Sequence, residues 1–145
     1  MRRALPGGFE LDDDPGRIDV VAVHRYLSEE SYWAAGRSFE TVERLVREAA
    51  RVVGLYDGDA QVGFARAVSD GVAVAYPADV YVLPEQRGQG LGEELVRLAV
   101  ELGQLADVRW LLHTRDAHSL YARVGFGPPG ERLMERQMGS TKLGG

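Results

Sequence analysis

The segment from Val80 to Leu95 constrains the fold of this chain more than any other part of the sequence. It reads as a strand, then a glycine-rich turn, then the first turn of a helix, with glycine at positions 88, 90 and 92. Backbone N–H groups at the start of a helix lack intrahelical partners, and the helix dipole there favours anions. Glycine allows those N–H groups to approach a phosphate closely. The segment therefore predicts a cradle for a pyrophosphate group.

Two familiar phosphate-binding motifs are excluded by the residues of this turn. A dinucleotide fingerprint needs glycine where this chain has Glu93, and a P-loop needs Gly-Lys-Ser/Thr, which does not occur. The pattern that remains is Arg-x-x-Gly-x-Gly, at Arg87, Gly90 and Gly92. It resembles the acetyl-CoA loop of the GNAT superfamily of N-acetyltransferases. The alternative is a glycine turn between a strand and a helix that binds no ligand.

A second motif follows downstream of this turn. Leu120-Tyr121, followed by three residues and Gly125-Phe126, resembles the end of GNAT domains. Thr114 can cap a short helix here, and Gly125 can end it. The apolar positions of that helix share one face: Ala117, Leu120, Tyr121 and Val124. Taken alone, Tyr121 would be interpreted as a tyrosine of the core. The phosphate cradle upstream favours a functional role for it instead.

The length and composition predict one domain that spans residues 1–145, with a flexible tail at 139–145. The chain contains no cysteine, and its three histidines are too scattered for a zinc site, so we expect no metal. No apolar run approaches the ~20 residues of a membrane span, and the residues after Met1 lack the apolar core of a signal peptide. We therefore expect a cytoplasmic protein.

The formal net charge of −5 argues against a general nucleic-acid binder, which usually carries a basic stripe. The same charge is compatible with a positively charged substrate. We expect no nucleic-acid or membrane partner, and a homodimer remains open.

The predicted elements follow the order β-α-α-β-β-β-α-β-α-β-β, which is also the order of the GNAT fold. Hairpins followed by a βαβα run predict a mixed α/β (α+β) fold, with a central sheet of about six to seven strands and helices on both faces. We predict strands at 9–11, 52–56, 61–68, 72–83 and 108–113, helices at 15–27, 38–49, 91–105 and around Tyr121, and a final hairpin from Phe126 and residues 133–137.

The resemblance implies a reaction and a cofactor site. GNAT enzymes move the acetyl group of acetyl-CoA to an amine by direct attack in a ternary complex. By analogy, the pyrophosphate lies on the backbone of Arg87, Gly88, Gln89, Gly90, Leu91 and Gly92. The pantetheine arm pairs with the backbone of Val80, Tyr81 and Val82. Thr114 stands where many members have an asparagine that contacts pantetheine, and it has a shorter reach.

The same resemblance suggests which groups move protons. Tyr121 is the expected acid for the CoA thiolate, because a phenol has an unperturbed pKa near ~10 and stays protonated at neutral pH. Asp79 alternates with Val80, so it faces the side of Tyr81. It could take the ammonium proton, attract the cation, or be a solvated carboxylate at a strand end. His118 is a rival base.

Three further points stay open at the level of sequence. Tyr32 and Trp33 could line the acceptor pocket or belong to the core. Pro77, which lacks an N–H, fits either a break in strand pairing or an ordinary edge strand. The expected function is an N-acetyltransferase that acts on a small-molecule or peptide amine. The alternative is a GNAT-fold module that senses acyl-CoA without turnover.

Overall fold

The strands form one mixed sheet in the order β1-β2-β3-β4-β5-β6, seen in a computed structural model that describes residues 1–138. Neighbouring strands are antiparallel except for the parallel pair β5–β6. The strands are β1 (Arg2–Ala4), β2 (Phe9–Asp12), β3 (Arg51–Asp57), β4 (Ala60–Ser69), β5 (Val74–Val82) and β6 (Arg109–Trp110). The tail predicted at 139–145 lies outside the described residues.

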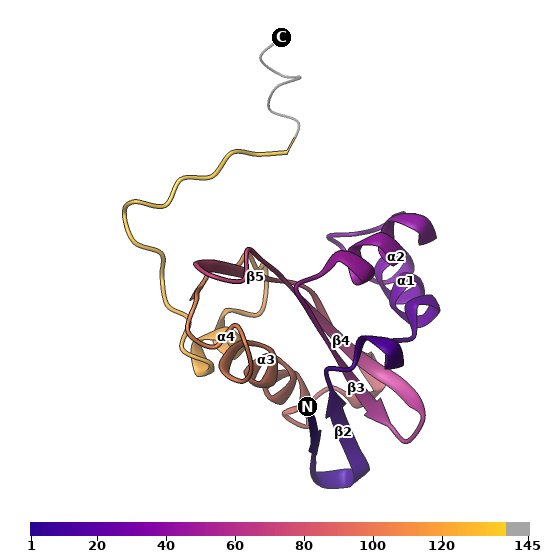
Figure 1. The fold of residues 1–145 in the computed structure, drawn as a ribbon. Helices are drawn as coiled ribbons and strands as arrows, with labels where there is room; N and C mark the ends of the chain where they lie inside the picture. Colours follow the sequence, from indigo (N-terminus) through magenta and orange to yellow (C-terminus); the bar gives the residue numbers. More distant parts are fainter. Residues whose placement is uncertain (139–145) are drawn as a thin grey trace.

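Helices cover both faces of the sheet, as the sequence predicted (Figure 1). On one face lie α1 (Val20–Glu29) and α2 (Phe39–Glu48), and on the other lie α3 (Leu91–Glu101) and α4 (His118–Arg123). Short 3-10 turns occupy Pro6–Gly8, Pro15–Arg17 and Pro84–Gln86. No helix within residues 1–138 is long and apolar enough to cross a membrane.

Two apolar clusters, one on each face, hold the helices to the sheet. Leu95 and Leu98 of α3 pack with Val53 and Leu55 of β3, and all four are fully buried. Across the sheet, α1 and α2 pack on β3, β4 and β5 through Val23, Tyr26, Leu27, Val42, Val46, Val52, Phe64 and Tyr81. Each fully buried Leu or Val side chain contributes roughly 1.5–3 kcal/mol. The alternation of these residues along β3 therefore fixes which helix covers which face.

The last two strands separate soon after they meet. β6 pairs with β5 only at Val74 and Ala75, whereas β5 continues to Val82. Pro77 lies just beyond the last of these pairs. A residue without an N–H is tolerated there, because no neighbouring strand needs that hydrogen bond. On the side of β6, the rest of β5 is therefore an edge within the described part of the chain. Both interpretations of Pro77 hold, because the break in pairing is what makes β5 an edge strand there.

A bulge in β5 follows directly. Phe64 pairs with Tyr81 and Arg66 with Ala78, so Ala65 lies opposite both Asp79 and Val80. Asp79 has a φ of 55°, which is in the left-handed region that a side chain rarely adopts. An extra residue in one strand bends that strand and re-aims its side chains. The bulge lies directly before Val80–Val82, the segment of β5 that leads into the glycine-rich turn.

Several predicted boundaries were wrong at the N-terminal half. The first helix does not start at Pro15, because Asp14 and Pro15 begin a 3-10 turn. The α-helix starts at Val20 instead, where the Asp19 side chain accepts a hydrogen bond from the Ala22 N–H. Strand β1 was missed, because its three residues are all exposed and give no apolar alternation.

The C-terminal predictions differ more from the structure. Helix α3 stops at Glu101 and not at residue 105, since Gly103 has a φ of +94°. The strand predicted at 108–113 is reduced to two residues. The final hairpin is absent from residues 1–138, where nothing after α4 is a strand. Pro128 and Pro129 lie between its predicted strands and cannot donate ladder bonds.

Candidate active site

A cavity of about 570 Å³ lies where the end of β5, the glycine-rich turn, the start of α3 and α4 meet. It brings together the two sequence motifs, which are about 30 residues apart. Of the predicted site residues, it is lined by Tyr32, Trp33, Val80, Tyr81, Val82, Arg87, Gly88, Gly90, Leu91, Gly92 and Tyr121. Gln89, Thr114, Asp79 and His118 do not line it.

The glycine-rich turn presents an uncapped helix start to this cavity. Gly88 and Gly90 have φ values of +83° and +78°, and a Cβ at either position would meet nothing within 4 Å. Gly90 is the N-cap of α3 and offers no side-chain hydrogen bond. The first N–H groups of a helix have no intrahelical acceptor, so those of Leu91 and Gly92 remain available. Open space and free donors at a positive helix end suit a phosphate.

Gly92 has a different task from the other two glycines. A Cβ at this position would lie 3.2 Å from Leu120 Cδ1 on α4. A side chain here would therefore push α4 away from α3. The glycine lets the helix that carries Tyr121 approach the start of α3.

The side chain of Arg87 points back into the protein. Its Nε donates to the Val82 carbonyl at 3.0 Å, and Nη2 donates to the Tyr26 hydroxyl at 2.9 Å. Tyr26 in turn stacks on Tyr81 with ring centroids 3.9 Å apart. Arg87 thus ties the turn to β5 and α1, which leaves its backbone rather than its guanidinium for a ligand.

The end of β5 offers backbone to the cavity because its side chains are engaged on the two faces. Tyr81 is buried against Tyr26 and Phe64, and burial raises the pKa of its hydroxyl. Val80 packs toward α3 and α4. Tyr81 and Asp79 face the same side, as predicted, since Asp79 bonds to Arg66 and Tyr81 pairs with Phe64.

Tyr121 lines the cavity from α4. Burial, together with the neighbouring Tyr32, Tyr76 and Asp116, raises the pKa of its hydroxyl to about 12. Its ring meets Phe126 edge-on at 5.6 Å. The ring is therefore fixed by packing, and the hydroxyl carries its proton across the whole physiological pH range.

Thr114 acts on the helix rather than on the cavity. Its Oγ1 accepts a hydrogen bond from the Ala117 N–H at 3.0 Å. Ala117, not Thr114, is the N-cap of α4, so the capping prediction was wrong in register. The threonine hydroxyl closes the turn that leads into the helix, and its proton remains free to donate.

Asp79 is buried at the bulge and is not a solvated carboxylate at a strand end. It accepts hydrogen bonds from Trp33 Nε1 at 2.8 Å, from Arg37 Nη1 at 3.1 and 3.2 Å, and from Arg66 Nε at 2.6 Å. Burial alone would raise its pKa, but Arg66, Trp33 and Arg37 hold the pKa of Asp79 below its usual range. Sequence analysis missed both arginines, which are 42 and 13 residues away along the chain.

Tyr32 and Trp33 line the cavity and do not belong to the core. They are 47% and 39% exposed, and their rings meet edge-on at 5.0 Å. The guanidinium of Arg115 lies 3.8 Å from the centre of the Tyr32 ring, and the Arg115 N–H donates to the Tyr32 hydroxyl at 3.3 Å. This contact joins the loop after α1 to the loop before α4. No pattern in the sequence indicated it.

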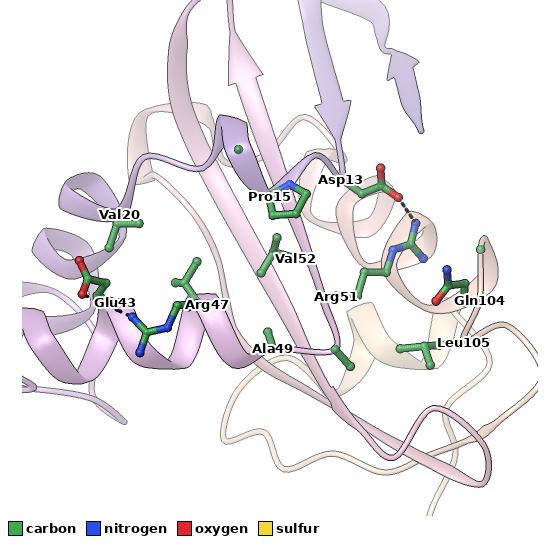
Figure 2. A pocket seen from close by; sticks show the side chains of 14 residues that line it. Asp13, Pro15, Val20, Glu43, Arg47, Ala49, Arg51, Val52, Gln104 and Leu105 are labelled. Carbon is green, nitrogen blue, oxygen red and sulfur yellow. Dashed lines mark hydrogen bonds and ion pairs between the residues drawn. The ribbon is translucent and has the colours of Figure 1, made fainter.

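A second cavity, of about 590 Å³, lies where β3 begins, between α2 and the segment after α3 (Figure 2). None of the predicted site residues lines it. Its charged side chains pair with one another: Arg51 with Asp13 at 3.1 Å, and Arg47 with Glu43 at 3.6 Å. Within residues 1–138, no group of three or more His, Cys, Asp or Glu side chains could hold a metal ion.

Comparisons with known proteins agree with this geometry. Residues 48–128, which contain both motifs, match the family described as acetyltransferase (GNAT) domain. A crystal structure of a GNAT-family protein from Xanthomonas campestris is 37% identical, with a TM-score of 0.83, and the match covers 90% of this chain and 93% of that one. A GNAT-family acetyltransferase from Streptococcus pneumoniae is 25% identical, with a TM-score of 0.65 and coverage of 89% and 99%.

A curated relative from Gibberella zeae, named as an inferred acetyltransferase, is 28% identical over 113 residues. The match covers 66% of this chain and 64% of the relative, so this chain spans less than two thirds of that protein.

Proposed function

This chain belongs to the GNAT family of acetyltransferases, and we propose that it moves the acetyl group of acetyl-CoA to a primary amine by direct attack in a ternary complex. The family makes the chain an acyltransferase, whereas the amine acceptor is our proposal. One observation carries it: a single cavity is lined both by the uncapped start of α3 and by the protonated phenol of Tyr121.

The residues present fit the cofactor. The free N–H groups at the start of α3 would hold the pyrophosphate, and the unpaired edge of β5 would align the pantetheine arm through its backbone. Of that edge, the Val82 carbonyl is already occupied by Arg87. Tyr81 pairs with Phe64, so its N–H and C=O point toward β4. The Val80 backbone and the Val82 N–H are therefore the groups left for pantetheine, and Thr114 can add its hydroxyl. Bound acetyl-CoA supplies the thioester that the amine attacks.

Tyr121 is the proposed acid. As the carbon–sulfur bond breaks, the CoA thiolate takes the proton of the Tyr121 phenol. The acetylated nitrogen then gives a proton to the phenolate, which restores the phenol. A hydroxyl with a pKa of about 12 keeps its proton at neutral pH, so Tyr121 does not ionise before the thiolate forms.

Asp79 has a supporting role in this proposal. A carboxylate with four hydrogen bonds from three side chains and a lowered pKa is a weak proton acceptor. Two guanidiniums surround one carboxylate, so the cluster carries a positive charge and would not attract an ammonium. We assign Asp79 to positioning, because it holds Trp33 at the wall of the cavity.

The function is tested by incubating the protein with acetyl-CoA and a panel of primary amines, including peptides with a free N-terminus, while free CoA is measured. We expect CoA release that depends on one class of amine. Tight acetyl-CoA binding without release on any amine would favour the sensor instead.

A further inference from the structure

His113, in the segment after β6, is held on both sides of its ring. Tyr76 Oη lies 2.6 Å from His113 Nδ1, and His113 Nε2 contacts a carboxylate oxygen of Glu135. A carboxylate accepts only, so Nε2 carries the proton toward Glu135. Nδ1 is then the acceptor for the Tyr76 hydroxyl. The three side chains form a hydrogen-bonded chain that runs from β5 to the C-terminal segment.

None of these three side chains lines the cavity, but the chain that they form lies next to it. Tyr76 pairs with Val68, two residues from Arg66 on β4, so it lies on the face that carries Asp79 and the loop after α1. Its hydroxyl is close enough to Tyr121 to raise the pKa of that residue. Tyr32 influences both phenols in the same way. His113 also lies two residues before Arg115, which lines the cavity and donates its backbone N–H to the Tyr32 hydroxyl, so this segment joins the hydrogen-bonded chain to the cavity wall.

Other groups in this region are less suited to remove a proton. Asp79 is saturated by its donors, and His118 is exposed on α4, where no hydrogen bond among the described residues joins it to these hydroxyls. The charged neighbours are Arg115, which stacks on Tyr32, and Asp116, which raises the pKa of Tyr121. Glu135 also accepts a hydrogen bond from Gln137. Within residues 1–138, only His113 joins a titratable side-chain nitrogen to this group of hydroxyls.

We propose that Tyr76, His113 and Glu135 are a proton relay that deprotonates the acceptor ammonium. This proposal rests on the function proposed above. The ammonium gives a proton to Tyr76 Oη as the Tyr76 proton passes to His113 Nδ1. The resulting imidazolium is balanced by Glu135 and releases its proton to solvent. The neutral amine then attacks the thioester, and Tyr121 protonates the thiolate.

The first test reads the relay without catalysis. The protein contains only three histidines, so ¹⁵N-histidine NMR can resolve each of them. We expect His113 to carry its neutral-state proton on Nε2, and Glu135→Gln to shift the Nε2 resonance, because a charge-assisted hydrogen bond becomes a neutral one. His113 protonated on Nδ1, or an Nε2 resonance unaffected by Glu135→Gln, would overturn the relay.

The second test uses the amine that releases CoA fastest in the panel. His113→Gln and Tyr76→Phe should each lower kcat/KM near neutral pH by roughly 10²–10⁴-fold. The loss should shrink to a few-fold near pH ~10, where a sizeable fraction of a simple amine is already neutral. His118→Gln is the matched control and should follow the parent at every pH.

The outcomes separate the two proposals. If the parent neither binds acetyl-CoA nor acetylates an amine, the proposed function fails, and the NMR result still decides whether the hydrogen-bonded chain exists. If the parent is active and the His113→Gln profile matches it, or lies below it by a constant factor at all pH values, the relay is wrong.

Discussion

Tyr121 is the residue on which the chemistry depends most directly. Tyr121→Phe removes one hydroxyl and keeps the ring that packs against Phe126, so folding should survive. We expect kcat to fall by roughly 10²–10⁴-fold, as is typical when a general acid is lost. Steady-state kinetics with the best amine of the panel measure this. Acetyl-CoA affinity should change little, and a kcat within a few-fold of the parent would mean that the thiolate leaves without this proton.

Asp79 is expected to act on stability. Asp79→Asn leaves Arg37 and Arg66 without their carboxylate partner, and breaking a buried pair costs about 3–5 kcal/mol. Urea unfolding near neutral pH should show this loss in the free energy of unfolding.

The stability that Asp79 contributes depends on pH in one direction. The folded pKa of Asp79 lies below its ordinary value of 3.8, so its contribution is complete above that pH and is lost as the pH falls through the folded pKa. The difference in the free energy of unfolding between the parent and Asp79→Asn should therefore disappear only below about pH 4. An equal stability of the two proteins at neutral pH would show that the Asp79 pairs contribute nothing.

The glycine-rich turn and α3 form the element that should hold the cofactor. Gly90→Glu places a negative charge in open space at the helix start, where it competes with phosphate. We expect acetyl-CoA binding, measured by calorimetry, to be lost.

Gly71→Glu is the matched control for this change. Gly71 has a φ of +82° and nothing within 4 Å, so it carries the same strain and charge, but it lies in the turn between β4 and β5 away from the cavity. Equal binding by the two variants would contradict the assignment of the cradle.

Elements with local signals could be predicted, and elements made by distant contacts could not. Gly90 and its neighbouring glycines predict a strand–turn–helix, and the apolar spacing around Tyr121 predicts a short helix. Both signals lie within a few residues of the element they predict. The partners of Asp79 could not be found this way, because Trp33 and Arg37 reach it across 46 and 42 residues. The Arg115–Tyr32 contact spans 83 residues. The predicted C-terminal hairpin is absent from residues 1–138, so the residues around 126 and 133–137 did not suffice to predict strand pairing.

For the whole molecule, cofactor binding should be visible as added stability. A ligand at 100 times its Kd adds about 2.7 kcal/mol, which for a domain of this size is a rise in Tm on the order of 5–10 °C. Acetyl-CoA and CoA should both produce this rise in a thermal melt. NAD and ATP, which lack the pantetheine arm, should produce much less. Equal shifts with all four compounds would indicate nonspecific phosphate binding.

Transfer of the acetyl group itself tests the account most directly. The protein is incubated with acetyl-CoA that carries a ¹³C-labelled acetyl group and with the amine that releases CoA fastest, and the product is identified by mass spectrometry. We predict one labelled acetyl group on the amine nitrogen, formed in step with free CoA and slowed strongly by Tyr121→Phe. Free CoA with labelled acetate and an unmodified amine, or no turnover despite tight binding, would contradict the assignment of this chain as an N-acetyltransferase.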